Sequence, residues 1–474
     1  MTLMIASTFG DAPSHATGVD LIEFRIDGPP TDEVVNTIPA KLASSPYPTI
    51  VTCRSICEGG LFDGSDEERA EMYNAALRCE SPPRYIDVEY EMLIRHPLFL
   101  DALELGETSV ILSWHDMEGR PSDLLQRATA MQDVPQIDVV KMVWRARSLR
   151  DNLEAFSLLQ SRQQPMIAMC MGEYGLMSRV LAPKFGGFAV YAALEEHELT
   201  APNQPTVCDL HNTYRFHDIN SETEVYGVIG NNVAHSLGPA YHNNAFHSQQ
   251  VNAVYLPLPI NKEWEQLKAT TLELTNHDSL SFRGASVTIP HKTNMMRLAD
   301  DQDELSQAVG STNTIANDGG TISTTNTDVQ AIKELIKDAS SALVLGSGGV
   351  ARSALAALHS LQIQTTIAAR NTQSRDELCN AFNCAAWSDK SNQPSLIINC
   401  TPVGMLGNEH EHASPLDLLA PSVELNNHIT VFDTVYAPKE TPLIKHAQLQ
   451  GCDVIFGETM FVKQAELQQA FWIR

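Results

Sequence analysis

Two lysines in this sequence stand where they could take part in a reaction. Lys141 lies within the apolar run Val139–Val143, and burial in such a run lowers the pKa of an amine and frees it as a nucleophile. Lys292 follows a proline turn, and Asp328 ends an Asn-Thr-Asp tripeptide. A lysine and an aspartate that meet can pass a proton to and from a hydroxyl group.

Each of these residues also has a purely structural interpretation. Lys141 could pair with Asp87 or Glu89 for stability alone. Lys292 could be ordinary surface charge, and Asp328 could cap the helix that follows it. A catalytic role becomes the better interpretation if other functional side chains lie near the same lysines.

Short apolar segments alternate with helical patterns in the first half of the chain. The expected strands are Leu3–Ser7, Leu21–Ile26, Thr49–Arg54, Tyr85–Tyr90, Ser109–His115, Val139–Trp144, Met166–Met171 and Phe188–Ala192. Helical patterns lie between them, for example over residues 66–78, 122–132 and 149–160. Eight such repeats predict an α/β fold, a closed (β/α)₈ barrel. Because about 200 residues is small for that fold, an open doubly wound sheet is the alternative.

Polar side chains gather at the carboxyl ends of the expected strands, where barrels carry their catalytic groups. They are Glu23, Arg25, Arg54, Asp87, Glu89, His115, Lys141, Arg179, Thr200 and Gln204. An amine, an imidazole, carboxylates and arginines at one barrel mouth suit a carbonyl substrate that carries a carboxylate. The chemistry they predict is imine formation on Lys141, then removal of a proton beside the imine.

A strand, a glycine turn and a helix follow one another between Ala342 and Leu358 in the second half. The turn and the helix start comprise Gly346, Ser347, Gly348, Gly349, Val350 and Ala351. This arrangement lets backbone N–H groups approach a pyrophosphate. The next strand, Thr365–Arg370, ends without the acid that binds the ribose of NAD, and Arg370 and Arg375 suit the 2′-phosphate of NADP. The predicted cofactor is NADP, bound by a Rossmann-like lobe.

Small hydroxyl and amide side chains follow several strand ends between residues 226 and 328. They include Ser236, Thr288, Asn313 and the Asn-Thr-Asp tripeptide that ends at Asp328. Many hydrogen-bonding groups with little bulk suit a polyol substrate. Lys292 and Asp328 would then exchange a proton with one of its hydroxyls during hydride transfer.

The composition limits the partners and the compartment. The 474 residues suffice for about three domains, and the net charge of −26 argues against nucleic acid and anionic membrane surfaces. The nine cysteines form no CxxC pair and no zinc spacing, so no metal site is expected. The first residues lack the pattern of a signal peptide, which predicts a cytoplasmic protein that acts on small molecules as a monomer or homodimer.

Residues 1 to about 210 resemble type I 3-dehydroquinate dehydratase. The matching motifs are Glu-x-Arg at Glu23–Arg25, Thr-Cys-Arg at Thr52–Arg54, Ile-Asp-Val-Glu ending at Glu89, Ser-x-His-Asp ending at Asp116, the strand Lys141, Ser178-Arg179, and Ala-Pro-x-Gln at Ala201–Gln204. The resemblance implies that Lys141 forms a Schiff base with a ketone and that His115 removes the proton and helps expel water. It also implies that Glu89 orients His115 and that Arg179 grips the carboxylate.

Residues from about Tyr226 to the end resemble shikimate dehydrogenase. The matching motifs are Ile-Gly-Asn followed by Ala-His-Ser ending at Ser236, Thr-x-Pro-His-Lys ending at Lys292, Asn313-Thr314, Asn-Thr-Asp ending at Asp328, the glycine turn, Asn399–Met405, Phe432–Pro442, and Gly457, Met460 and Gln464. The resemblance implies a catalytic dyad of Lys292 and Asp328. It implies substrate contacts from Ser236, Thr288, Asn313, Tyr436 and Gln464, and a contact of Gly457 with the cofactor.

One departure from the second pattern bears on specificity. Many shikimate-specific relatives have a serine where this chain has Gly238, and relatives that accept quinate tend to have glycine there. Thr288, by contrast, matches the shikimate-using pattern.

The whole chain resembles the fused dehydratase–dehydrogenase family. We expect a dehydratase barrel at residues 1–212, a substrate lobe at 222–325 with a C-terminal helix at 446–474, and an NADP lobe at 326–445. The implied reactions are the dehydration of 3-dehydroquinate to 3-dehydroshikimate and its reduction to shikimate. A preference for quinate and a non-catalytic metabolite sensor are the alternatives, and the presence of Lys141, His115, Lys292 and Asp328 together favours the enzyme.

Overall fold

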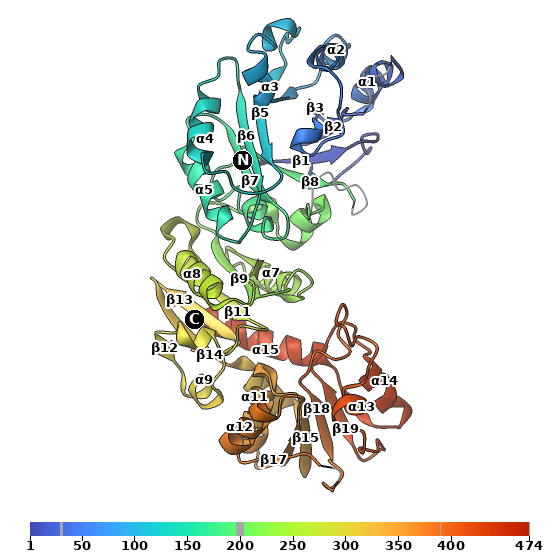
Figure 1. Cartoon of the computed structure of the whole chain (residues 1–474), viewed down its shortest axis with the longest axis vertical. Coiled ribbons are helices and arrows are strands. Elements are labelled where there is room, and N and C mark those ends of the chain that lie inside the picture. Colours follow the sequence, from blue (N-terminus) through green and yellow to red (C-terminus); the bar gives the residue numbers. More distant parts are fainter. Residues whose placement is uncertain (29–31, 196–202, 389, 474) are drawn as a thin grey trace. The chain divides into compact units, whose positions relative to one another are not determined.

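The computed structural model describes residues 1–28, 32–195, 203–388 and 390–473 (Figure 1). The chain forms two compact units. The first contains Met1–Val225 and Ala234–Ile260, and the second contains Tyr226–Val233 and Asn261–Arg474. The finer domain boundaries expected at 212, 325 and 445 stay a prediction.

Eight parallel strands form the core of the first unit, in the order β7-β6-β5-β4-β3-β2-β1-β8. Their bounds are β1 Leu3–Thr8, β2 Leu21–Arg25, β3 Thr49–Thr52, β4 Tyr85–Glu89, β5 Ser109–Asp116, β6 Val139–Arg145, β7 Met166–Met171 and β8 Ala189–Ala193. β1 pairs with both β2 and β8, so the sheet curls back on its first strand. At the seam, the N–H of Phe188, just before β8, donates to the carbonyl of Met166 at 2.8 Å. The predicted barrel is confirmed, and the open sheet is wrong.

Helices follow most of the barrel strands. They are α1 Asp32–Ser44, α2 Asp66–Leu77, α3 Tyr90–Arg95, α4 Leu124–Gln132, α5 Asp151–Ser161 and α6 Leu176–Val180. α2 starts where the sequence signals it, because Ser65 and Glu68 form a reciprocal capping box. The unit also contains α7 (Gly238–Ser248) and β10 (Ala253–Pro259), joined by hydrogen bonds between the Asn243 side chain and the backbone of Tyr255.

The barrel interior is layered because side chains alternate along each strand. An apolar layer at the amino end contains Leu21, Ile50, Ile111, Val139, Ile167 and Ala189. The next inward position on several strands is polar, and these residues are Glu23, Thr52, Asp87, Ser113, Lys141 and Tyr191. The alternation therefore brings the predicted lysine inside the barrel, directly above an apolar floor.

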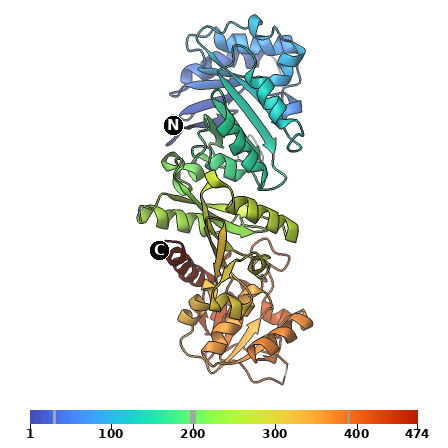
Figure 2. The same cartoon turned by 90° about the vertical axis from the view of Figure 1, so that its left-hand side faces the viewer.

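The second unit contains two sheets. The first has the order β9-β11-β13-β14-β12, with β9 Glu224–Gly230, β11 Phe282–Val287, β12 Asp301–Gln302, β13 Thr314–Asp318 and β14 Thr321–Thr325. Its helices are α8 Trp264–Thr275, α9 Glu304–Val309, α10 Thr327–Leu335 and the C-terminal α15 Gly457–Trp472. α15 is tied to β13, because the indole N–H of Trp472 donates to the carbonyl of Ile315 at 2.9 Å. In Figure 2 it is the dark red helix at the C-terminus.

The second sheet is entirely parallel, with the order β17-β16-β15-β18-β19-β20. Its elements are β15 Ser341–Leu345, α11 Gly349–Ser360, β16 Gln364–Ala368, α12 Thr372–Phe382, β17 Ala385–Ala386, β18 Leu396–Asn399, α13 Pro415–Leu419, β19 Thr430–Asp433, α14 Pro442–Leu449 and β20 Asp453–Ile455. Counted within this sheet, the order is 3-2-1-4-5-6, which is that of dinucleotide-binding folds. The predicted Rossmann-like lobe is confirmed.

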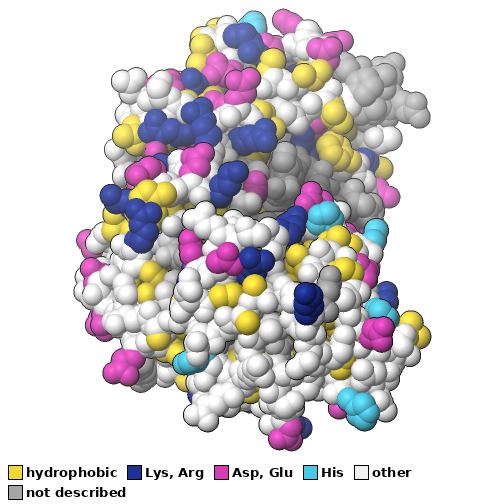
Figure 3. All heavy atoms as spheres, turned by 60° about the horizontal axis from the view of Figure 1, so that its bottom comes forward, with side chains coloured by type: hydrophobic (Ala, Val, Ile, Leu, Met, Phe, Trp, Pro, Cys, Tyr) yellow, Lys and Arg dark blue, Asp and Glu magenta, His cyan; other side chains and the backbone are white. Residues whose placement is uncertain are grey.

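The surface shows no single-sign face in the view of Figure 3, where basic and acidic side chains are interspersed. Among the described residues, no helix is both long and apolar enough to cross a membrane. The cytoplasmic location and the monomeric or homodimeric state stay predictions.

Candidate active sites

Lys141 occupies the inward layer of β6, between Val139 and Val143. Its ammonium nitrogen lies 2.9 Å from Asp87 Oδ2 and 3.9 Å from Glu23 Oε1. The same nitrogen lies 3.8 Å from the ring centroid of Tyr191. Burial lowers the pKa of Lys141, although Asp87 and Glu23 oppose the shift. The amine is thus both held by a carboxylate and shifted toward its nucleophilic form.

Asp87 connects Lys141 to the other charged groups of the barrel. Its Oδ1 accepts from Arg54 at 2.7 Å and from the hydroxyl of Ser113 at 2.5 Å, while Oδ2 accepts from Lys141. Burial alone would raise the pKa of Asp87, but Arg54 and Lys141 hold it well below its usual range. The carboxylate stays ionised and positions the lysine.

His115, on β5, contacts a carboxylate that the sequence analysis did not name. Its Nδ1 lies 2.9 Å from Oε2 of Glu58, in the turn after β3. Glu89, expected as its partner, accepts instead from the Ser55 N–H, from Arg69 and, at 3.5 Å, from Arg54. The side chain of Glu89 belongs to a salt-bridge network at the strand end, and Glu58 reaches His115 because its loop folds back over the barrel mouth.

The ionisation of this pair follows from its burial. Burial lowers the pKa of His115 well below its usual value, and the nearby cations Arg54 and Lys141 lower it further. Burial raises the pKa of Glu58 to about 8, with Arg54 opposing the shift. Burial thus favours the neutral form of the imidazole, and it keeps the carboxyl of Glu58 protonated to higher pH than an ordinary glutamate.

Arg179 is a buried cation at the end of α6. It is 3% exposed, and its one hydrogen bond in the described part of the chain goes to the backbone carbonyl of Tyr191 at 2.9 Å. Burial lowers its pKa to about 10, because no carboxylate among the described residues pairs with it. A buried guanidinium of this kind is a ready site for a carboxylate from outside the chain.

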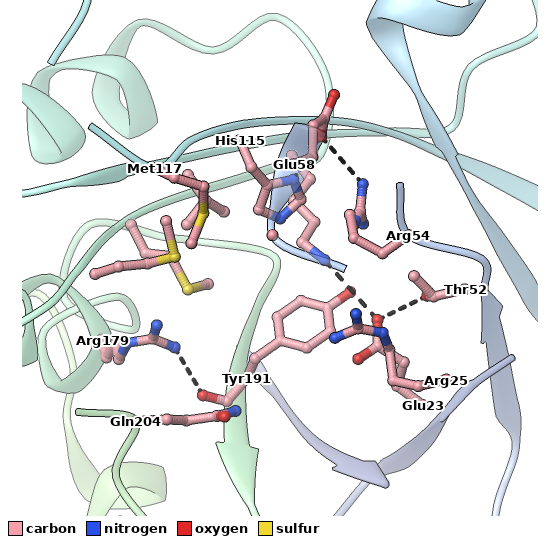
Figure 4. A pocket seen from close by; sticks show the side chains of 15 residues that line it. Glu23, Arg25, Thr52, Arg54, Glu58, His115, Met117, Arg179, Tyr191 and Gln204 are labelled. Carbon is pink, nitrogen blue, oxygen red and sulfur yellow. Dashed lines mark hydrogen bonds and ion pairs between the residues drawn. The ribbon is translucent and has the colours of Figure 1, made fainter. Parts of the chain in front are cut away.

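One cavity brings these groups together at the carboxyl ends of the strands (Figure 4). It is lined by Glu23, Arg25, Thr52, Arg54, Glu58, Gly59, His115, Met117, Lys141, Val143, Met169, Met171, Arg179, Tyr191 and Gln204. Arg25 is already paired, through two hydrogen bonds, with Asp27. Asp87 and Glu89 are not among the lining residues, and Thr200 lies outside the described residues.

The second site centres on a close contact between Lys292 and Asp328. Lys292 Nζ lies 2.5 Å from Asp328 Oδ2, and both side chains are buried. The amide of Asn313 donates to Asp328 Oδ1 and to the hydroxyl of Thr327, each at 2.9 Å. It also donates to Gln464 of α15 at 3.3 Å. Lys292 and Asn313 thus hold the two oxygens of the Asp328 carboxylate, and Asn313 is itself linked to α15 through Gln464.

The other expected substrate residues are distributed over several elements. Thr288 follows β11, and its Cγ2 lies 2.4 Å from a Cβ built on Gly230, so a side chain at 230 would displace it. Tyr436 follows β19, with its ring centroid 5.6 Å from that of Phe461 on α15. Ser236 and Gly238 lie in the first unit at the start of α7, where the Ser236 hydroxyl accepts from the Gly238 N–H.

The glycine turn contains positions that a larger residue could not occupy. Gly346 has a φ of +108°, and a Cβ there would lie 2.9 Å from Thr401. Gly348 caps α11, and a Cβ on Gly349 would lie 3.0 Å from the side chain of Lys292. Ser347 and Val350 are half-buried, whereas Ala351 is buried inside the helix. The turn therefore approaches the Lys292–Asp328 pair as closely as backbone can.

The two arginines after β16 differ in their surroundings. Arg375 is paired with the neighbouring Asp376 at 2.7 Å, whereas Arg370 is exposed and has no ion pair among the described residues. Gly457 begins α15, and a Cβ there would lie 2.4 Å from the Val435 carbonyl. Arg370 is the freer cation for a phosphate, and Gly457 allows α15 to approach the end of β19.

Glu58 and Thr327 are the functional candidates that sequence reasoning missed. Glu58 stands before the pair Gly59-Gly60, and Gly60 must be glycine because a Cβ there would lie 2.1 Å from the Arg54 carbonyl. A carboxylate beside a forced tight turn at a barrel strand end was the available signal. Thr327 is the middle residue of the Asn-Thr-Asp tripeptide, and its hydroxyl accepts a hydrogen bond from the Asn313 amide at 2.9 Å.

Known proteins resemble both halves of the chain. Residues 10–221 match the family model described as type I 3-dehydroquinase, and residues 228–315 match that of the shikimate dehydrogenase substrate binding domain. The bifunctional 3-dehydroquinate dehydratase/shikimate dehydrogenase, chloroplastic, of Arabidopsis thaliana is 32% identical over 480 residues, which cover 95% of this chain and 77% of the relative.

Two further relatives cover different parts. The shikimate dehydrogenase (NADP(+)) of Maridesulfovibrio salexigens is 34% identical over 263 residues, which are 54% of this chain and 93% of that protein. The pentafunctional AROM polypeptide of Mycosarcoma maydis is 28% identical over 492 residues, which are 92% of this chain and 28% of that protein. The chain therefore belongs to the family of bifunctional 3-dehydroquinate dehydratase/shikimate dehydrogenases.

Proposed function

We propose that the first half dehydrates 3-dehydroquinate to 3-dehydroshikimate through an imine on Lys141, and that the second half reduces this product to shikimate with NADPH. The observation that carries the proposal is that one cavity is lined by a buried amine, a buried imidazole and a buried guanidinium that has no carboxylate partner among the described residues. These are the groups that a keto acid needs for imine formation, proton removal and carboxylate binding.

The dehydration begins at the amine of Lys141. Its neutral form attacks the ketone carbon, and loss of water gives the imine. Arg179 binds the substrate carboxylate and so fixes the ring. Glu23, Arg25, Arg54, Thr200 and Gln204 are proposed to contact the remaining oxygens of the substrate.

His115 then takes a proton from the carbon beside the imine. For this its free ring nitrogen must carry a lone pair, which requires the proton on Nδ1, held by an ionised carboxylate. Glu58, at 2.9 Å from Nδ1, supplies that carboxylate in our proposal, in place of Glu89. The hydroxyl leaves as water after proton return from the imidazolium, and hydrolysis of the imine releases the product.

Reduction with borohydride tests the imine. Borohydride added with 3-dehydroquinate should attach a stable adduct to Lys141, found by peptide mass spectrometry. The variant Lys141→Ala should give no adduct. An adduct on another lysine, or active enzyme without one, would exclude the proposed chemistry.

The second half offers a fitting place for NADP. The close approach of Gly349 to Lys292, the left-handed Gly346 and the exposed Arg370, which has no ion pair among the described residues, would accept a dinucleotide with a 2′-phosphate. Gly346, Ser347, Gly348, Gly349, Val350, Ala351, Arg370, Arg375 and Gly457 are the residues proposed to hold it. When bound, NADPH supplies the hydride that reduces the ketone.

Lys292 and Asp328 manage the proton of this reduction. Lys292 donates a proton to the forming alkoxide, and Asp328, whose Oδ2 lies 2.5 Å from the lysine nitrogen, holds the amine in place. Asn313 holds the other oxygen of Asp328, so the carboxylate has one fixed orientation. Ser236, Gly238, Thr288, Asn313, Tyr436 and Gln464 are proposed to bind the polyol.

One coupled assay tests the whole proposal. 3-Dehydroquinate and NADPH should give shikimate with consumption of the cofactor, while 3-dehydroquinate alone should stop at 3-dehydroshikimate. Oxidation of shikimate and of quinate, compared on the same preparation, decides between the main proposal and a preference for quinate.

A further inference from the structure

Tyr191, on β8, carries a hydroxyl that the proposed mechanism does not use. The residue is 6% exposed and lines the cavity of the barrel. Its hydroxyl is buried and has no hydrogen-bonding partner among the described residues. Buried hydroxyls are normally paired, and an unpaired one costs stability. An unpaired hydroxyl in a cavity of this kind suggests that its partner is a bound molecule.

The Tyr191 ring lies beside Lys141, where a bound substrate would reach it. Lys141 Nζ lies 3.8 Å from the centre of the Tyr191 ring, and the backbone carbonyl of Tyr191 accepts from Arg179 at 2.9 Å. Tyr191 therefore touches both the residue proposed to bind the substrate covalently and the residue proposed to bind its carboxylate (Figure 4). Because Lys141 Nζ lies against the ring, a substrate joined to that nitrogen lies beside the Tyr191 side chain.

We propose that the Tyr191 hydroxyl is a substrate-binding group of the dehydratase, donating a hydrogen bond to a hydroxyl oxygen of the bound polyol. This inference rests on the proposed function of the barrel. Two of the cations that line the cavity are already paired within the protein: Arg25 with Asp27, and Arg54 with Asp87. The Tyr191 hydroxyl, by contrast, donates to no group among the described residues.

The phenol is suited to donate and not to accept a proton. Burial raises its pKa well above the usual value, and Glu23 and Asp87 raise it further. The hydroxyl stays protonated throughout the pH range of an enzyme assay. A role as a donor therefore predicts an effect that does not change with pH, whereas a role as a base predicts one that grows as the pH rises.

The test is Tyr191→Phe, which removes the hydroxyl and keeps the ring beside Lys141. We expect the KM for 3-dehydroquinate to rise roughly five- to ten-fold, equally at pH 6 and pH 9. At saturating substrate, the borohydride-trapped adduct should form as in the wild type. The thermal midpoint without substrate should stay the same or rise, because an unpaired buried hydroxyl is lost.

Two controls belong to the same experiment. Tyr85→Phe changes a tyrosine at the amino end of β4, whose ring contacts Phe188 and which does not line the cavity, and it should leave the KM unchanged. The reduction of 3-dehydroshikimate by each variant reports the integrity of the other half.

Each outcome decides the inference. A wild-type KM in Tyr191→Phe, or a lower thermal midpoint with an unchanged KM, would overturn it and leave the proposed dehydratase intact. A wild type that does not dehydrate 3-dehydroquinate at all would overturn both. As a second measurement, a crystal structure of the borohydride-reduced adduct should place the Tyr191 hydroxyl within about 3 Å of a substrate oxygen, and a larger separation would also reject it.

Discussion

Each half of the chain places a buried lysine against a buried aspartate, and the two pairs differ in what surrounds them. Lys141 lies 2.9 Å from Asp87 in the barrel, and Lys292 lies 2.5 Å from Asp328 in the second unit. All four side chains are buried. A lysine–aspartate contact alone would therefore not separate the two chemistries.

The barrel pair belongs to a charged network. Asp87 is shared between Lys141, Arg54 and Ser113, so the lysine receives only part of its charge. Burial then lowers the pKa of Lys141 and favours the neutral amine. The strand backbone fixes the amine in the centre of the cavity, which suits a nucleophile.

The other pair belongs to a network of neutral groups. Asp328 interacts with Lys292 on one oxygen and with the Asn313 amide on the other. No second cation among the described residues pairs with this carboxylate, so Lys292 is its one charged partner there. The two pairs therefore differ in how the aspartate is shared: with two cations and a hydroxyl in the barrel, and with one lysine and an amide in the second unit.

Replacing each lysine in turn should give the largest effect, because each replacement should stop one half-reaction and spare the other. We expect Lys141→Ala to abolish dehydration and leave the reduction of 3-dehydroshikimate unchanged. Lys292→Ala should lower the reduction roughly 10²- to 10⁴-fold and leave dehydration unchanged. The measurement is the kcat of both half-reactions on each purified variant.

Lys141→Met and Lys292→Met are the matched controls, because they keep most of the buried stem without the amine. They should reproduce the losses seen with alanine. If either replacement impaired both half-reactions, the two sites would not be independent, or the chain would be misfolded.

The second test asks which glutamate, Glu58 or Glu89, orients His115, because both carboxylates are buried near Arg54. Burial raises the pKa of Glu58 to about 8, and only its ionised form can hold the proton on Nδ1 of His115. The kcat/KM for dehydration should therefore rise with pH up to about 8. Glu58→Gln should remove that rise and lower the rate roughly ten- to a hundred-fold.

Glu89→Gln should behave differently. Arg54, Arg69 and burial act on Glu89, and the two arginines hold its pKa below the usual value against the effect of burial. Its replacement breaks a buried salt-bridge network, which costs about 3–5 kcal/mol of unfolding free energy, and leaves the pH profile as in the wild type. Urea unfolding and the pH profile of kcat/KM, measured on both variants, separate the two roles. A flattened pH profile in Glu89→Gln would mean that Glu89, as first expected, orients His115.

The sequence could predict what depends on periodicity and could not predict contacts made by loops. Alternation along β6 put Lys141 inside the barrel, and the glycine spacing after β15 predicted the nucleotide-binding turn. Glu58 lies outside any strand, and only the folding of residues 55–60 brings it to His115. The sequence also does not reveal whether an arginine has an acidic partner. Arg25 is paired with Asp27, whereas Arg179 has no carboxylate partner among the described residues.

The cofactor preference should respond to Arg370 more than to Arg375. Losing one phosphate contact of about 1.5 kcal/mol should raise the KM for NADPH roughly ten-fold in Arg370→Ala and leave the use of NADH nearly unchanged. Arg375→Ala is the matched control, and its effect should be smaller because Asp376 already pairs with Arg375. Steady-state kinetics with both cofactors measures this, and an equal loss with NADPH and NADH would assign Arg370 a structural role.

Gly238 gives the smallest expected effect, and the structure changes how it should be tested. A Cβ at this position would lie 2.9 Å from Cε1 of Tyr255 and 3.2 Å from its hydroxyl oxygen. Tyr255 is held by Asn243 and stacks on His242 with ring centroids 4.3 Å apart. A serine at 238 therefore brings two opposing effects: a new hydroxyl for the substrate and a methylene that crowds a fixed ring.

Gly238→Ala separates them, because alanine adds the Cβ without the hydroxyl. We expect Gly238→Ser to favour shikimate over quinate relative to Gly238→Ala by roughly five-fold, the value of one neutral hydrogen bond of about 1 kcal/mol. The quantity to measure is the ratio of kcat/KM for the two polyols in the wild type and both variants. Equal ratios in the serine and alanine variants would mean that the space at position 238, and not a hydroxyl, sets the preference. If the wild type favoured quinate, shikimate would no longer be the proposed product of this half.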